Sequence, residues 1–224
     1  METRRLRRQL TSRLIHSALA CALVLAQGTG WAGASKGNPM TTLNDPAASR
    51  AERIKAAKAL AGSKDPQAID TLVTQLDIRD EGIVAAVENA LRALNAVPVL
   101  ERRLTDGNAS EEQRVSACTG LRALKEKSSI PPLVSALKDD SARVRKEAAL
   151  ALGAIAPAEA ETALLTALSD SDDDVRYFAA EALGSVRTAA VTQAIQARLA
   201  AETSPVVRSA LLAAKNKLDR AASR

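Results

Sequence analysis

Residues 139–155, DDSARVRKEAALALGAI, are repeated in outline by residues 169–186, SDSDDDVRYFAAEALGSV. Both stretches place acidic residues ahead of Val-Arg and follow it with small residues and Ala-Leu-Gly. Aligning the whole chain on this pattern produces one column that recurs every 30 to 32 residues: Arg53, Val84, Arg114, Arg145, Arg176 and Arg208. Such a period is typical of repeat proteins in which each unit is one small group of packed helices.

Each repeat contains two apolar patterns of helical period, separated by short breaks. All prolines except Pro39 fall just before or within the first turn of a predicted helix, where a missing N–H has no helical partner. No stretch alternates as a half-buried strand does, so we expect no sheet. The prediction is one helix followed by five pairs: 47–61; 66–77 with 81–94; 97–105 with 111–124; 130–138 with 142–155; 158–169 with 172–186; and 189–201 with 205–218.

The repeated Val-Arg-x-x-Ala-Ala-x-Ala-Leu-Gly, preceded by leucine and aspartate, resembles the HEAT repeat. The short period resembles the HEAT-like repeats of the phycobilin-lyase type, and the resemblance covers residues 43–218. It implies an all-α, right-handed solenoid of about five short helix pairs plus one N-terminal helix. It also implies a ladder of Asp–Arg pairs along the stack, and a concave face lined by the second helix of each pair.

The N-terminal segment has the three parts of a secretory signal peptide. Residues 1–13 are basic, residues 14–26 are apolar, and Ala32-Gly33-Ala34 offers a cleavage site. An apolar run of 13 residues is too short for a membrane span, which needs about 20. We therefore predict a signal peptide over 1–34, a disordered leader over 35–46 and a repeat domain over 47–224. The alternative for this segment is a lipoprotein acylated on Cys21.

Removal of residues 1–34 changes the charge of the protein. The whole chain has 31 basic and 26 acidic residues and a net charge of +5, but five of the arginines and one glutamate lie in the predicted signal. The remainder carries a net charge of about +1, which gives no basic surface for nucleic acid. We expect a periplasmic or secreted bacterial protein, a monomer with no membrane span after cleavage.

Enzymatic chemistry finds little support in the sequence. The single histidine, His16, lies in the predicted signal, so nucleophiles activated by histidine are excluded from the mature chain. Asp170, Asp172 and Asp174 are spaced as in a calcium loop, but Val175 stands where that loop needs glycine. Cys118 aligns with alanines and is expected to pack as a small apolar residue. We predict no catalytic residue, no metal and no cofactor.

The arginine column has two interpretations, a surface that grips a ligand or a staple between repeats. Acidic residues precede each arginine, as Asp139 and Asp140 precede Arg145, which favours the staple.

The helical wheel instead points another set of side chains away from the core, with Tyr177 as the strongest candidate anchor and Phe178 packing between repeats. The predicted function is an exported, non-catalytic scaffold that binds a protein or peptide. The alternative is an accessory, chaperone-like subunit of a lyase-type protein-modifying system. The predicted partner-binding residues on the concave face are Val115, Thr119, Lys146, Leu150, Tyr177 and Glu181.

Overall fold

Helices provide all the regular secondary structure of residues 37–222, which are the residues that the computed structural model describes. The predicted signal peptide, Cys21 and the first two residues of the leader lie outside this range. Every predicted helix is present, and three have the predicted bounds. The elements in chain order are α2 (Pro39–Asn44), α3 (Arg50–Leu60), α4 (Gln67–Val73), α5 (Glu81–Ala93), α6 (Ala96–Thr105), α7 (Glu111–Leu124), η2 (Lys127–Ser129), α8 (Ile130–Ala136), α9 (Ala142–Ile155), α10 (Glu161–Ala167), α11 (Asp173–Leu183), α12 (Ala189–Ala201) and α13 (Pro205–Ala222).

The leader departs from the expectation of disorder over 35–46. Residues 39–44 form α2, and Leu43 in this helix is fully buried. Its carbonyl oxygen accepts a hydrogen bond of 3.1 Å from Nε of Arg53. Tertiary contacts with α3 thus order a short polar segment whose own sequence gives little sign of a helix.

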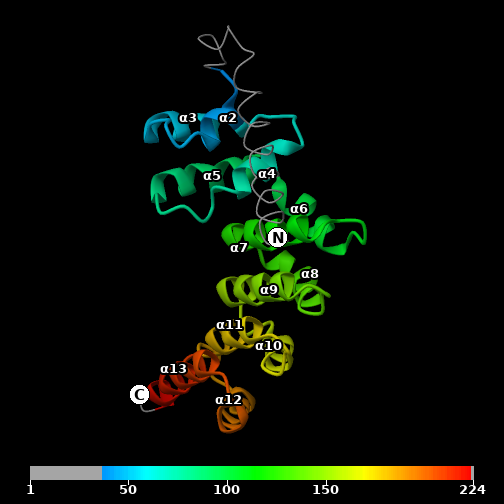
Figure 1. Cartoon of the computed structure of the whole chain (residues 1–224), viewed down its shortest axis with the longest axis vertical. Helices are drawn as coiled ribbons and strands as arrows, with labels where there is room; N and C mark the ends of the chain where they lie inside the picture. Colours follow the sequence, from blue (N-terminus) through cyan, green and yellow to red (C-terminus); the bar gives the residue numbers. More distant parts are fainter. Residues whose placement is uncertain (1–36, 223–224) are drawn as a thin grey trace, which may run out of the picture. The chain divides into compact units, whose positions relative to one another are not determined.

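The second helix of each pair (α5, α7, α9, α11 and α13), together with the leading helix α3, forms a stack in chain order, as Figure 1 shows. We call these six the second helices. The first helix of each pair packs against its own second helix, for example α8 on α9 and α10 on α11. The interior consists almost wholly of leucine, alanine, valine and isoleucine, and Leu91, Leu121, Leu152 and Leu183 recur in it at the repeat period, each fully buried. The fold is therefore an α-solenoid.

No single helix within residues 37–222 is long and apolar enough to cross a membrane. Helices α5 and α6 together reach the necessary length and composition, but they are bent by 83° with respect to each other. The bend occurs at Asn95, whose φ of 49° lies in the left-handed region.

Three bidentate ion pairs connect successive second helices, and we call each one a rung. Nε and Nη2 of Arg114 donate to the carboxylate of Asp139 at 2.7 and 3.0 Å. Arg145 binds Asp170 in the same way at 2.8 Å for both bonds, and Arg176 binds Glu202 at 2.9 and 3.2 Å. Such fork-to-carboxylate pairs fix geometry as well as charge.

The rungs confirm the staple and correct its partner. The expectation paired Arg145 with the acids just before it, but Asp139 and Asp140 supply only backbone carbonyls, to Nη1 at 2.9 and 3.1 Å. The carboxylate comes from Asp170, one repeat later. Each arginine therefore organises its own turn with Nη1 and holds the following repeat with the other two nitrogens.

The ladder is interrupted in the N-terminal part of the stack. Val84 replaces the arginine on α5, and Asp106, the nearest acid in the next repeat, makes no ion pair within the described residues. Arg53 on α3 donates to the amide oxygen of Gln75 at 2.6 Å instead of to a carboxylate. The contact between α5 and α7 is also the least extensive between successive second helices.

Candidate partner-binding site

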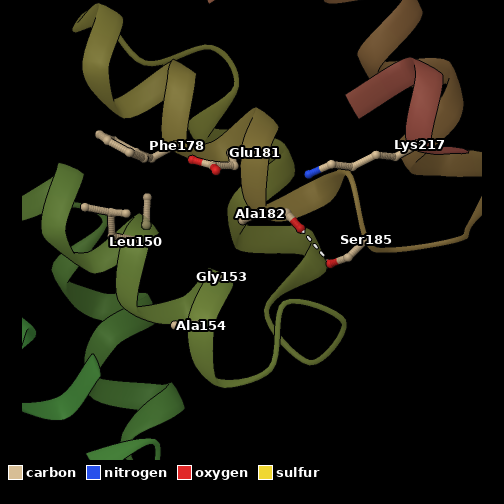
Figure 2. Close-up of a pocket in the computed structure, with 9 residues that line it drawn as sticks. Leu150, Gly153, Ala154, Phe178, Glu181, Ala182, Ser185 and Lys217 are labelled. Atoms are coloured by element: carbon tan, nitrogen blue, oxygen red, sulfur yellow. Dashed lines mark hydrogen bonds between the residues drawn. The ribbon is translucent and has the colours of Figure 1, made fainter. Parts of the chain in front are cut away.

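A recess of about 330 Å³ opens on the second helices near the C-terminal end of the stack. Helices α9 and α11 form most of it, and α13 contributes one long side chain (Figure 2). Its lining residues are Ala149, Leu150, Gly153, Ala154, Phe178, Glu181, Ala182, Ser185 and Lys217.

Small side chains form the floor of the recess because two helices meet there with almost no space between them. A Cβ atom added to Gly153 would lie 2.9 Å from Cβ of Ala182. The same contact recurs one repeat later, where a Cβ on Gly184 would lie 3.2 Å from Cβ of Ala214. Glycine at this register lets the helix backbones approach closely.

The apolar wall of the recess consists of Leu150 from α9 and Phe178 from α11, which lie across from each other in Figure 2. Both side chains are half-buried. The ring of Phe178 packs edge-on against Tyr177, with centroids 5.0 Å apart and planes at 80°. This edge-to-face contact holds the Phe178 ring beside the recess without covering it fully.

Two opposite charges flank the apolar wall. Glu181 on α11 and Lys217 on α13 are both exposed, and neither side chain has an ion pair or hydrogen bond within residues 37–222. Figure 2 shows the amino group of Lys217 directed toward the recess. Ser185 donates from Oγ to the carbonyl oxygen of Ala182 at 3.1 Å, which leaves its own oxygen able to accept. The arrangement suits a ligand with an apolar group flanked by polar or charged ones.

The structure brings together two of the six predicted residues, Leu150 and Glu181, in this recess. Val115, Lys146 and Tyr177 are half-buried on the same set of helices but do not line it. Nζ of Lys146 lies 3.9 Å from carboxylate oxygens of its neighbour Glu147 and of Asp174 on α11.

Thr119 corrects the prediction of an outward row. Only 7% of this residue is exposed, so it is not available on a binding face. Helix α7 is in contact with α4, α5, α6 and α9, and the whole run from residue 117 to 121 is buried. The helical wheel treated α7 like α9, which has fewer neighbours.

The analysis of the sequence missed Phe178 and Lys217 as site residues. Phe178 was expected to pack between repeats, but it lines the recess, and Tyr177 supports it from the side. The signal that was available is the glycine at the same register in consecutive repeats, Gly153 and Gly184. A repeated glycine in a helix indicates close backbone contact and a hollow beside it.

Metal or thiol chemistry has no site in the part of the chain that the structure describes. No group of three His, Cys, Asp or Glu residues is placed to hold an ion there. Asp170 is engaged by Arg145, and Asp172 caps α11 by accepting from the backbone N–H groups of residues 174 and 175. Burial raises the pKa of the Cys118 thiol well above its ordinary value, which leaves it protonated and unreactive.

Stacked helix pairs with a side chain repeated at one register define an α-helical repeat protein. The family model described as "HEAT repeats" matches residues 97–163 and 130–215, which is more than half of the chain, and the model "PBS lyase HEAT-like repeat" matches residues 52–77. The chain belongs to the HEAT-repeat family, as its repeated motif predicted.

Several solved structures are similar to this chain in fold. The human deoxyhypusine hydroxylase in complex with glycerol is 23% identical, covering 81% of this chain and 73% of that one, with a TM-score of 0.48. A designed armadillo repeat protein in complex with the peptide (KR)4 is 20% identical, with coverages of 81% and 99% and a TM-score of 0.44. The complex of CpcE and CpcF of phycocyanin lyase from Nostoc is 20% identical, with both coverages 80% and a TM-score of 0.32. No curated protein sequence matches the chain.

Proposed function

We propose that this protein is an exported, non-catalytic scaffold that binds a segment of another protein in the recess on α9, α11 and α13. The observation that carries the proposal is the combination of an apolar wall with two unpaired charges around a floor of small residues. Binding sites for protein segments typically combine a pocket for an apolar anchor with a polar rim.

The chemistry of the binding segment follows from the recess. Leu150 and Phe178 accept an aliphatic or aromatic side chain of moderate size, because the recess holds about 330 Å³. Glu181 and Lys217 favour a segment with a basic and an acidic residue on either side of that anchor. The non-catalytic role is supported by the sequence of residues 37–222, which contains no histidine to activate a nucleophile.

The proposed binding site is tested by site-specific photocrosslinking in the native cell. A photoreactive amino acid at position 181 should capture a defined partner, whereas the same amino acid at Gln193, exposed on α12, should not. Substitution of Phe178 by alanine should weaken partner binding by about 1–3 kcal/mol, as expected for an anchor pocket. Equal capture from positions 181 and 193 would place the binding face elsewhere.

Export is tested independently by sequencing the N-terminus of the protein purified from its own cell. The proposal expects the mature chain to begin at Ser35, after the small-residue site at 32–34. A chain that begins at Met1 contradicts export but leaves the recess and its ligand untouched.

An assisting role in protein modification is the second candidate, supported by the match of residues 52–77 to the PBS lyase HEAT-like repeat. It predicts that deletion of the gene changes the covalent state of the crosslinked partner. Mass spectrometry of that partner, with and without the gene, separates this role from a plain scaffold.

A further inference from the structure

The column of ladder arginines extends one position beyond the three rungs, to Arg208 on α13. Nη1 of Arg208 donates to the carbonyl oxygens of Leu199 and Glu202 at 2.8 and 3.0 Å. Nη1 of Arg145 and of Arg176 make the same pair of carbonyl contacts. The turn that positions the guanidinium is therefore complete at the fourth position.

The carboxylate of this fourth rung is missing from the described residues. Nε and Nη2 of Arg208 have no acceptor in residues 37–222, and its side chain is exposed. In contrast, the side chains of Arg145 and Arg176 are only 14% and 8% exposed. Arg208 thus presents an oriented fork whose geometry matches a carboxylate.

An uncovered apolar residue lies beside this fork. Leu212 is 45% exposed, and it and Val206 are the two exposed large hydrophobic residues of the described chain. Leu212 stands at the register of Cys118, Ala149 and Ala180, which are fully buried on α7, α9 and α11. The face of α13 that is covered in the earlier second helices is open here.

The charges of α13 indicate what this face accepts. Lys217 and Arg220, like Arg208, have no carboxylate partner in the described residues, whereas Asp219 already pairs with Lys215 at 2.6 Å. A second copy of the chain docked end to end would bring Arg50, Lys55 and Lys58 of α3 against this basic face. Charge complementarity therefore favours an acidic partner over a second copy.

We propose that this end of the stack, formed by Arg208, Leu212 and the basic side chains of α13, is a docking surface for a different protein. That partner supplies an aspartate or glutamate in a turn that leads into a helix, as Asp139, Asp170 and Glu202 do within this chain. The carboxylate completes the fourth rung, and the partner helix covers Leu212. This surface is separate from the recess and does not depend on its proposed function.

The test uses a labelled peptide with the sequence of residues 168–186, which contains Asp170 and α11, as a stand-in for the acidic turn and helix. Fluorescence anisotropy with the full chain should show saturable binding that weakens with salt. Arg208→Ala should weaken it by about tenfold or more, and the peptide with Asp170→Ala should lose a similar factor. The two changes together should cost little more than either alone, because they remove the same contact.

The matched control is Arg187→Ala, which removes an exposed arginine that is unpaired within the described residues and lies away from α13. It should leave the affinity unchanged, and circular dichroism should show that both variants remain folded. Equal affinity for wild type and Arg208→Ala overturns the proposal, as does the absence of saturable binding up to about 1 mM peptide. Sedimentation of the chain alone provides a second arm: self-association that depends on Arg208 would make a second copy the occupant and contradict the proposed partner.

Discussion

The stack from α7 to α13 and the stack from α3 to α5 share one architecture but are fastened differently. The C-terminal region is held by three rungs with largely buried arginines and carboxylates. The N-terminal region relies on more exposed pairs, such as Arg50 with Asp80 at 2.8 Å and Arg122 with Asp77 at 2.9 Å. Because each unit of a solenoid contacts only its neighbours, such differences stay local. Stability is therefore expected to vary along the chain.

Removal of a rung arginine should have the largest effect on this contrast. Arg176→Ala leaves the carboxylate of Glu202, whose side chain is fully buried, with only Arg198 as a charged partner. Loss of one partner of a buried pair typically costs about 3–5 kcal/mol, and the remaining arginine favours the lower value. Urea denaturation measures the loss, and hydrogen exchange should locate it in α11–α13.

The control for that variant is Arg143→Ala, because Arg143 also pairs across two helices but is 59% exposed. It should cost less than about 1 kcal/mol. If the two variants lose equal stability, burial does not distinguish the rungs from surface ion pairs.

Acid should weaken the same region, by less than the arginine deletion because a protonated Glu202 still accepts hydrogen bonds. The hydrogen bonds from Arg176 lower the pKa of Glu202 from 4.5 to about 2. A lowered folded-state pKa stabilises the protein fully above pH 4.5, and this contribution is lost as the pH falls toward 2. Melting curves between pH 5 and pH 2 should therefore fall more steeply for wild type than for Glu202→Gln. Parallel curves would contradict the role of this carboxylate.

A side chain at the close helix contact should have an intermediate effect. Gly184→Val introduces a Cβ 3.1 Å from Cα of Ala214, and backbone atoms cannot move aside cheaply. The expected cost is about 1–3 kcal/mol. Gly62→Ala, whose added Cβ meets no atom within 4 Å, should stay within about 0.5 kcal/mol of wild type. Thermal denaturation of both variants decides, and a neutral Gly184→Val would contradict the close contact.

Restoration of the missing rung should have the smallest effect. Val84→Arg places a guanidinium toward Asp106, which is exposed, so the gain should be below about 1 kcal/mol. Hydrogen exchange in α5 and α7 should report a local slowing. A gain that survives Asp106→Ala would show that the new arginine acts through another contact.

The helices could be predicted from the sequence because the repeat supplies six copies of one pattern. The bounds of α7, α9 and α12 agree with the prediction, and the box that caps α7 at Ser110 and Gln113 is present. Helix α2 could not be predicted, because buried Leu43 and a contact with Arg53 order it rather than its own composition.

The site was harder to predict than the fold. Tyr177 and Phe178 are adjacent in the chain, and a helical wheel separates them without showing how far the neighbouring helices cover each one. The rung partners posed a similar difficulty, because acids recur at the same register and each arginine has one in its own repeat and one in the next. Spacing alone cannot choose between them, whereas the observed distances can.

The rungs also have a mechanical consequence. A force applied along the stack is carried in series by the contacts between successive repeats, since each repeat meets only its neighbours. The contact between α5 and α7 has no rung and should yield first under load. Helices α7 to α13 would remain one stiff block, and the recess between α9 and α11 would keep its shape while the chain is under tension.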